Sequence, residues 1–476
     1  MKKTALCLVV MLWIIQIAQA GTIDSVNYGA FGKIMLYHPA GKPTSVALFV
    51  SGDGGWNLGV HDMAKNMVSQ GALVLGIDAK HYKKELAKQP GECVYPAADF
   101  EQLSLMIQRK YAFSAYLKPI LVGYSYGASL VYGVLAQAPA NTFKGAIALG
   151  FCPDIDINKP LCKGTALLVH AIKANHSYYL DRTPGLTAPF VVLNGINDQT
   201  CPYAATSAFL KGLPNAQLVG LNKVGHGFSV NANWLPQFKA AYSKILSAPS
   251  FNPVKGAQQK STKADLAKTN LPLTLLPSPA KNDLPLVFFI SGDGGWTSFD
   301  QSVSESMVKE GMPVVGLDVQ KYFWNKKTPE RTAADVSRAL AIYMQKWHKT
   351  TFVLAGYSFG ASVIPFVANR LPADLKLRMD GLCCFSPDEW ADFEIHILDM
   401  LHLSGDQGDY DVVAEMNKVK TVRPVCIFGG DEDSAARKKL QKDGIKVVTL
   451  PGGHHYNNNY TVLAKDLLDN ITVNHR

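Results

Sequence analysis

The hexapeptide SGDGGW occurs twice in this chain, at residues 51–56 and again at 291–296. Each copy directly follows a run of β-branched and aromatic residues, VALFV and LVFFI. Other landmarks repeat in the same order, among them VLGIDAKHY and VVGLDVQKY, which are also 240 residues apart (314 − 74, as 291 − 51). A nearly constant offset over a series of landmarks indicates that the chain is a tandem duplication of one domain.

Between the two sets of landmarks, residues 247–283 are rich in Pro, Ser, Ala, Lys and Asn, a composition typical of a linker. We therefore predict a first domain over residues 21–247, a linker over 248–268 and a second domain over 269–476. Within each domain, short apolar strands alternate with amphipathic helical stretches. This alternation predicts an α/β fold in which helices flank a mostly parallel sheet.

Residues 1–20 have the pattern of a secretory signal peptide. Lys2 and Lys3 precede an apolar stretch that is too short to span a membrane, and residues 18–20 form an A-Q-A cleavage site. We therefore expect a periplasmic protein. The net charge is +9, and no run of Lys and Arg is long enough to indicate nucleic-acid binding.

The cysteines of the mature chain divide unequally between the two halves, four in the first and three in the second. An oxidising compartment permits disulfides, and four cysteines allow three pairings. Cys152 and Cys162 are close enough in sequence to close a small loop. In the second half, at least one thiol should be buried and unpaired. No Cys or His spacing suits a metal, and the chemistry proposed below needs no cofactor.

The pattern G-x-S-x-G occurs around Ser125 and again around Ser358. Each copy follows an apolar run and opens a helical stretch, the strand–turn–helix setting of a nucleophile elbow. The flanking glycines suit a turn in which the serine backbone is strained and its neighbours must be small. Both serines are therefore candidate nucleophiles.

A serine hydroxyl needs a base, and the base needs an orienting acid, which follow in the order Ser, Asp, His in such enzymes. In the first domain, Asp198 and His226 follow Ser125 in this order. In the second domain, His454 follows Ser358, and Gly430-x-x-Asp433 resembles Gly195-x-x-Asp198, so Asp433 is the candidate acid and Asp431 the alternative.

The hexapeptide is placed to stabilise an oxyanion. One backbone N–H would come from the residue after the serine, Tyr126 or Phe359, and the other from the hexapeptide turn. In the second domain that turn offers Asp293 or Gly294, and in the first Asp53 or Gly54. Its tryptophan either walls the pocket or packs over the sheet; the sequence leaves both open.

The doubled domain, the leader, SGDGGW, GYSFGAS and the ending PGGHHY resemble the AcvB/VirJ bacterial virulence protein family, a group of α/β hydrolases. The resemblance implies a VirJ-like hydrolase in the C-terminal domain, with Ser358 as nucleophile, Asp433 as orienting acid and His454 as base. It also implies a periplasmic location and hydrolysis of lysyl-phosphatidylglycerol, an aminoacylated phospholipid at the membrane surface. The first domain departs from this expectation because it keeps a triad of its own.

A cationic lysyl group favours carboxylates or aromatic faces near the pocket. The candidates follow strands of the second domain: Asp318, Tyr322, Phe323 and Trp324 in one loop, and Asp388, Glu389 and Trp390 in another. For each of these residues taken singly, a role in packing is the favoured interpretation.

Two alternative functions stay open. The first is a non-enzymatic scaffold or chaperone for a type IV secretion system, whose proteins would then be its partners. The second is a serine hydrolase that acts on another ester or on a peptide.

Overall fold

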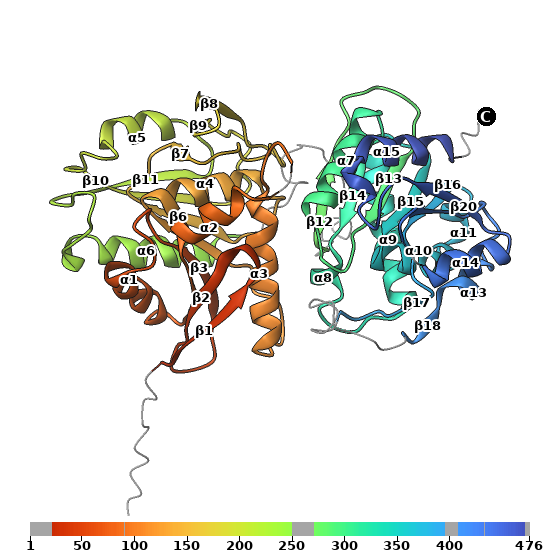
Figure 1. Cartoon of the computed structure of the whole chain (residues 1–476), viewed down its shortest axis with the longest axis horizontal. Coiled ribbons are helices and arrows are strands. Elements are labelled where there is room, and N and C mark those ends of the chain that lie inside the picture. The colour runs from red at the N-terminus through yellow and green to blue at the C-terminus, as the bar shows by residue number, and fades with distance from the viewer. Residues whose placement is uncertain (1–20, 90, 250–270, 396–407, 433, 472–476) are drawn as a thin grey trace, which may run out of the picture.

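The chain folds into two α/β units that lie side by side (Figure 1). The computed structural model describes residues 21–89, 91–249, 271–395, 408–432 and 434–471. The predicted signal peptide and residues 250–268 of the predicted linker lie outside the described residues. Each unit contains one large sheet, and the two sheets share no strand.

The sheet of the first unit has eight strands in the order β1-β2-β4-β3-β5-β6-β10-β11. Its strands from β4 to β11 run parallel, while β1 and β2 pair antiparallel at one edge. The strands are β1 (Ile23–Tyr28), β2 (Gly32–Tyr37), β3 (Ser45–Val50), β4 (Ala72–Ile77), β5 (Ile120–Tyr124), β6 (Gly145–Leu149), β10 (Phe190–Gly195) and β11 (Ala216–Leu221).

The sheet of the second unit repeats this arrangement without the first edge strand, in the order β12-β14-β13-β15-β16-β19-β20. Here β12 pairs antiparallel with β14, and the others are parallel. This strand order, with its antiparallel edge, is that of an α/β hydrolase, as the alternating pattern predicts. The strands are β12 (Leu273–Leu276), β13 (Leu286–Ile290), β14 (Val314–Leu317), β15 (Phe352–Tyr357), β16 (Met379–Phe385), β19 (Val425–Gly429) and β20 (Lys446–Leu450).

Helices cover both faces of each sheet because the central strands are apolar on both sides. In the first unit α1 and α6 pack on one face, and α2 to α5 on the other. These helices are α1 (Leu58–Val68), α2 (Ala79–Leu86), α3 (Pro96–Lys110), α4 (Tyr126–Gln137), α5 (Tyr203–Leu210) and α6 (Leu235–Ser247).

In the second unit α7 and α15 cover one face, and α8, α9, α10, α13 and α14 contribute to the other. The helices are α7 (Ser298–Lys309), α8 (Val319–Tyr322), α9 (Pro329–Lys346), α10 (Phe359–Arg370), α11 (Ala373–Lys376), α13 (Val412–Met416), α14 (Ala435–Lys442) and α15 (Tyr460–Asp469). No helix among the described residues is long and apolar enough to cross a membrane.

Between β6 and β10 the first unit inserts a small antiparallel sheet in the order β7-β9-β8. Its strands are β7 (Asp154–Asp156), β8 (Val169–Lys173) and β9 (Ser177–Leu180). The second unit has instead a two-stranded pair, β17 (Trp390–Ala391) with β18 (Tyr410–Asp411).

Two disulfides lie in the first unit, Cys93–Cys162 and Cys152–Cys201. The suggested small loop between Cys152 and Cys162 is therefore wrong, because each of these cysteines pairs with a residue that is distant in sequence. The three cysteines of the second unit are free and buried, as expected for at least one of them.

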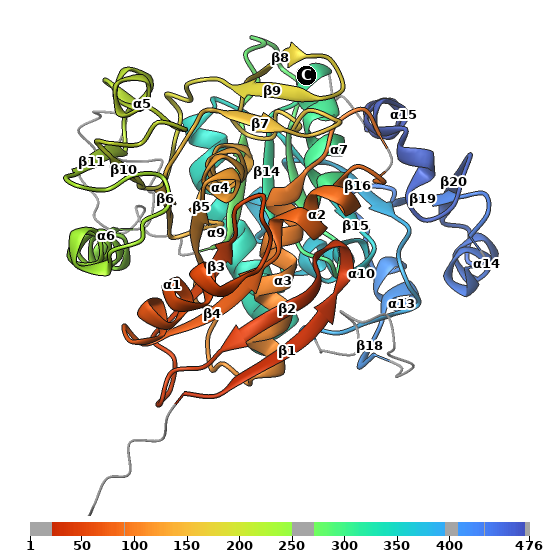
Figure 2. The same ribbon diagram turned by 60° about the vertical axis from the view of Figure 1, so that its left-hand side comes forward.

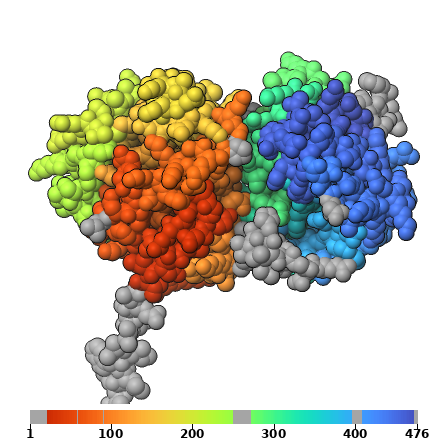
Figure 3. Space-filling model, viewed as in Figure 1, coloured from red at the N-terminus to blue at the C-terminus, as the bar shows by residue number. Residues whose placement is uncertain are grey.

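The two units contact each other through α3, which lies against the second unit in both ribbon views (Figures 1 and 2). The space-filling view shows the two halves in contact (Figure 3).

Candidate active sites

Both candidate nucleophiles stand on sharp turns between a strand and a helix. Ser125 connects β5 to α4 with φ 54° and ψ −119°, and Ser358 connects β15 to α10 with φ 50° and ψ −114°. Non-glycine residues rarely adopt a positive φ, so both serines have the strained backbone of a nucleophile elbow. A Cβ on Gly127 would lie 2.4 Å from the Val50 carbonyl oxygen, so this position of the motif requires glycine.

In the first unit the three predicted residues meet. The Ser125 hydroxyl lies 2.8 Å from Nε2 of His226, and Nδ1 of the same ring lies 2.9 Å from Oδ2 of Asp198. The second carboxylate oxygen of Asp198 accepts the backbone N–H groups of Thr200 and Cys201, at 2.9 and 2.8 Å. The carboxylate is therefore fully hydrogen-bonded and can orient the imidazole as a base toward the serine.

In the second unit the carboxylate that bonds to the histidine belongs to Glu432, which was not among the predicted residues. Nδ1 of His454 lies 2.9 Å from Oε2 of Glu432. The other oxygen of Glu432 accepts from the Ser386 hydroxyl at 2.8 Å and from the backbone N–H of Gly429 at 2.5 Å. The predicted acid, Asp433, lies outside the described residues. Its alternative, Asp431, is exposed and is not bonded to the histidine in the described structure.

Strand register explains why Glu432 was not predicted. Gly195 ends β10 and pairs with Leu221, while Gly429 ends β19 and pairs with Leu450. Three residues beyond these equivalent glycines stand Asp198 and Glu432, and both donate their backbone N–H back to the glycine carbonyl at 3.2 Å. The prediction of Asp433 rests on the neighbouring Gly430 and on aspartates alone. Glu432 is found when the position is counted from Gly429 and glutamate is accepted as the acid.

The serine and histidine of the second unit are not hydrogen-bonded to each other in this structure, although both are described. The His454 side chain is 44% exposed, against 21% for His226, so the second site is more open. Its neighbour His455 bonds through Nδ1 to the Tyr357 hydroxyl at 2.9 Å and is not part of the triad.

The surroundings of His454 are strongly acidic. Burial lowers the pKa of this imidazole, but the hydrogen bond and charge of Glu432, with the charges of Asp388 and Asp293, outweigh burial and raise the pKa above its ordinary value. The same pairing lowers the pKa of Glu432 despite its desolvation. These carboxylates create a local environment that favours cations.

The hexapeptide turn of the second unit approaches the nucleophile through its backbone. A Cβ on Gly292 would lie 3.7 Å from Cβ of Ser358. The N–H of Gly294 donates to its neighbour's side chain, Oδ1 of Asp293, at 2.9 Å, and the N–H of Gly292 points to Oδ1 of Asp300 at 3.4 Å. Gly294 and Asp293 were the two predicted donors of the turn. In the described structure the backbone N–H of Asp293 has no acceptor, so it is the one that is available to a substrate. This N–H and the backbone N–H of Phe359 form the candidate oxyanion hole.

The serine and the tryptophan of each hexapeptide have structural roles. The hydroxyls of Ser51 and Ser291 accept the N–H of Ala79 and Val319, at 3.0 and 3.1 Å, and so tie the turn to the first residue of α2 or α8. The Trp296 ring is buried against the sheet, where a Cβ on Gly316 would lie 2.0 Å from it, and Trp56 packs in the same way on Gly76. Packing over the sheet is therefore the correct alternative for the tryptophan.

The predicted substrate-binding residues Asp318, Tyr322 and Trp324 are all buried and already engaged, so this prediction is corrected. Asp318 caps α8 and pairs with Lys321 at 2.9 Å. The hydroxyl of Tyr322 donates to Asp335 at 2.8 Å, and the Trp324 ring lies under the Arg109 guanidinium, 3.9 Å from its centre. Phe323 is likewise buried.

The second candidate loop lies closer to the chemistry. Asp388 is exposed, its backbone N–H bonds to the Ser362 hydroxyl at 2.9 Å, and its charge acts on His454. Trp390 instead pairs with Asp411 in the small sheet, and Asp388 is the residue of this group whose charge acts on His454.

The family was determined by a sequence comparison. The profile described as bacterial virulence protein (VirJ) matches residues 44–149 and 284–475. This chain belongs to the VirJ family. The matched part of the second unit contains Ser358, Glu432 and His454, whereas the match to the first unit ends before Asp198. Curated protein sequences gave no match.

Solved structures of low sequence identity also resemble this VirJ-family chain. The esterase domain of a Rhodothermus marinus protein is 16% identical, with a TM-score of 0.32, and the match covers 47% of this chain and 98% of that one. A dienelactone hydrolase from Anabaena variabilis is 17% identical, with a TM-score of 0.32 and coverages of 48% and 97%. The esterase Est2 of Thermogutta terrifontis is 14% identical, with a TM-score of 0.31 and coverages of 48% and 91%. The assignment of the hydrolase fold rests on the strand order of the two large sheets.

Proposed function

We propose that this VirJ-family protein is a serine hydrolase that cleaves carboxylic esters. The observation that carries the proposal is the continuous hydrogen-bonded chain Ser125–His226–Asp198 on a nucleophile elbow. The second unit supports it with the same elbow and an acid–histidine pair, Glu432 and His454. Among the described residues, no group of three or more His, Cys, Asp or Glu side chains is placed to hold a metal ion.

The mechanism follows from the groups present. Histidine Nε2 takes the serine proton, and the serine oxygen attacks the ester carbonyl. Backbone N–H groups of the hexapeptide turn and of the residue after the serine stabilise the oxyanion. The alcohol leaves with the proton held by histidine, and water then attacks the acyl-enzyme with the same histidine as base. The released products are the alcohol and the free acid, and the serine hydroxyl is regenerated.

For the substrate, we propose an aminoacylated phospholipid, lysyl-phosphatidylglycerol, at the periplasmic membrane surface. The family resemblance suggests it, and the carboxylates around His454 support it, because Asp293, Asp388 and Glu432 favour a cationic acyl group. Hydrolysis would release lysine and phosphatidylglycerol. This assigns the substrate to the second unit, with Ser358 as nucleophile, and the periplasmic location rests on the predicted signal peptide.

The test is lysine release from vesicles that contain lysyl-phosphatidylglycerol, with the mature protein and its Ser125→Ala, Ser358→Ala and double variants. We expect release that is lost in Ser358→Ala and in the double variant. Release lost only in Ser125→Ala would move the substrate to the first site. No release, together with hydrolysis of p-nitrophenyl acetate, would keep the hydrolase and reject the lipid. Neither activity in the wild type would favour the scaffold or secretion-system interpretation.

A further inference from the structure

Helix α3 of the first unit is buried almost all the way round. Among its residues only Lys110 is exposed, and Asp99, Gln102 and Arg109 are half-buried. A surface helix normally buries one face only. One face of α3 packs on its own sheet, and the other meets the second unit near α8 (Figure 1).

From this helix, a side chain reaches the hexapeptide turn of the second site. The Gln102 side-chain amide donates to the carbonyl of Gly294. The preceding carbonyl, that of Asp293, accepts from the Gln320 side chain of α8 at 2.7 Å. Two consecutive backbone carbonyls of the turn thus accept hydrogen bonds from side chains outside the turn. Since Asp293 supplies the candidate oxyanion N–H, the two amides fix the backbone that presents this donor.

Helix α8 is itself held by α3. Lys321 forms ion pairs with Asp318 of its own helix cap and with Glu101 of α3. These two carboxylates raise the pKa of Lys321 despite its burial, so the ammonium stays charged. Truncating one member of such a buried cluster would leave an uncompensated charge, which is costly.

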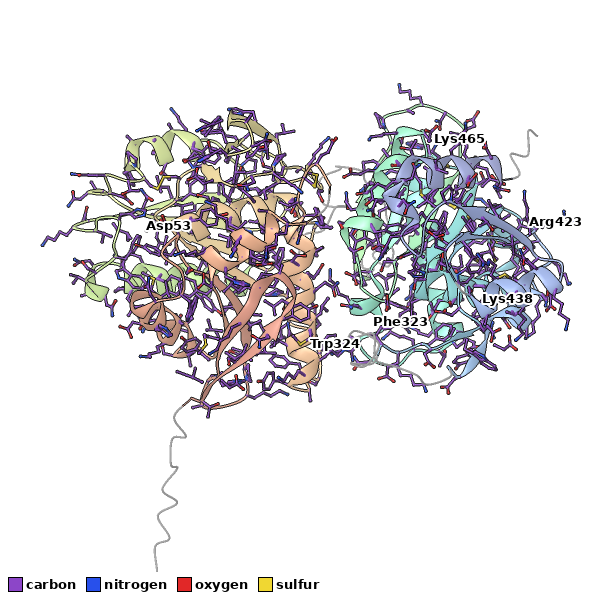
Figure 4. All side chains as sticks on the ribbon, viewed as in Figure 1. Asp53, Phe323, Trp324, Arg423, Lys438 and Lys465 are labelled. Carbon is purple, nitrogen blue, oxygen red and sulfur yellow. A yellow bond between two sulfur atoms is a disulfide. The ribbon has the colours of Figure 1, made fainter. Side chains whose placement is uncertain are left out.

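A second anchor lies at the end of α3. The Arg109 guanidinium stacks on Trp324 and donates to the Phe323 carbonyl at 3.3 Å, while the Trp324 indole donates to the Phe113 carbonyl at 3.3 Å. Figure 4 places Trp324 at the boundary between the units.

The first site has no such support. Its turn residues Asp53 and Gly54 are exposed, and in the described part of the chain no side chain donates to their carbonyls. At the position of Gln320 the first unit has Lys80, which is exposed. Figure 4 shows Asp53 well away from the boundary.

We propose that α3 of the first domain is a positioning element of the second active site, with Gln102 as the residue that holds its oxyanion turn. The inference rests on the proposed function of the second site. It makes the first domain a structural part of the second domain's catalytic machinery.

The first test needs no activity. Hydrogen exchange is measured in the full mature chain and in its Gln102→Glu variant, which keeps the side-chain size and loses the donor. We expect faster exchange over residues 292–296 and unchanged exchange over residues 52–56. Lys110→Ala, on the exposed end of the same helix, is the matched control and leaves both turns unchanged. Equal exchange over residues 292–296 in wild type and Gln102→Glu overturns the proposal.

The second test uses p-nitrophenyl acetate and isolates one site at a time. In a Ser125→Ala background, Gln102→Glu should lower kcat roughly tenfold with KM nearly unchanged, because a displaced oxyanion donor weakens only transition-state binding. In a Ser358→Ala background, the same substitution should leave kcat unchanged. Unchanged kcat in both backgrounds overturns the proposal. If Ser125→Ala alone abolishes hydrolysis, the proposed function of the second site fails, and the exchange result then decides separately whether Gln102 holds the turn.

Discussion

The two sites of this molecule have the same elbow and the same order of serine, acid and histidine, but they hold the acid differently. In the first unit the disulfide Cys152–Cys201 ends three residues beyond Asp198, and two backbone N–H groups saturate one oxygen of that carboxylate. In the second unit, side-chain hydrogen bonds replace the disulfide. Ser386 donates to Glu432 and also contacts the Tyr456 hydroxyl at 2.5 Å.

The two acids are held differently because one backbone position carries glycine in the first unit, Gly150, and serine in the second, Ser386. Gly150 and Ser386 both have positive φ, 65° and 50°, and both donate their N–H to the neighbouring strand, to Leu193 and Ile427. A Cβ on Gly150 would lie 3.2 Å from the His226 ring. In the second unit the Ser386 side chain uses this space to hold a longer acid. The first site is therefore self-contained, whereas the second has the more exposed histidine and is supported by its neighbour domain.

The largest expected effect is that of removing the acid's charge. Asp198→Asn should lower kcat of the first site, and Glu432→Gln that of the second, by roughly 10³- to 10⁴-fold, because the histidine loses its orienting acceptor. The measurement is p-nitrophenyl acetate hydrolysis in the Ser358→Ala and Ser125→Ala backgrounds, respectively.

Asp433→Asn and Asp431→Asn are the matched controls for the second site. Both should leave kcat within about twofold of the parent, because His454 bonds to Glu432 and substitutions that spare this pair have small effects. If Asp433→Asn is as damaging as Glu432→Gln, the assignment of the acid from the structure is wrong and the one from the sequence is right.

The next effect concerns the disulfide. The double variant Cys152→Ser/Cys201→Ser should destabilise the first unit by about 2–4 kcal/mol, because the unfolded chain regains loop entropy. The second unit should be unaffected, since its described cysteines are free. Denaturant dependence of hydrogen exchange over β10 and β19 reports on each unit in the same sample. Equal loss of protection in both strands would show that the two units unfold together.

The smallest expected effect is a shift in the pH dependence of kcat/KM at the second site. The raised pKa of His454 means that more of this imidazole is protonated at a given pH, so Ser358 should gain reactivity only above the ordinary histidine range. Asp388→Asn removes one negative charge and should move the rise in reactivity to lower pH. The measurement is kcat/KM against pH in the Ser125→Ala background, with the exposed Asp374→Asn as control. A profile that Asp388→Asn leaves in place would remove this carboxylate from the site.

Local sequence patterns predicted the parts of the sites that depend on local geometry. The duplication, the α/β layers and the two elbows follow from strand–turn–helix patterns, which are short-range. The acid of the second site was missed because its place depends on where β19 ends, and element boundaries are the least certain part of a prediction.

Long-range packing decided what the sequence left open. Asp318 follows a strand and precedes a helix, a pattern that suits a helix cap as well as a binding residue, and the structure has the cap. Trp324 is buried by a domain contact that no local pattern encodes. One signal was available: residues 103–107 of α3 read LSLMI, which gives the helix an apolar side beyond the face toward its own sheet.

The most direct test of two working serine sites is fluorophosphonate labelling of the mature protein, with the modified residues mapped by mass spectrometry. The account predicts labelling at both Ser125 and Ser358, each lost only in its own alanine variant. Labelling at neither serine would contradict it, because an elbow with an acid-oriented histidine activates its serine.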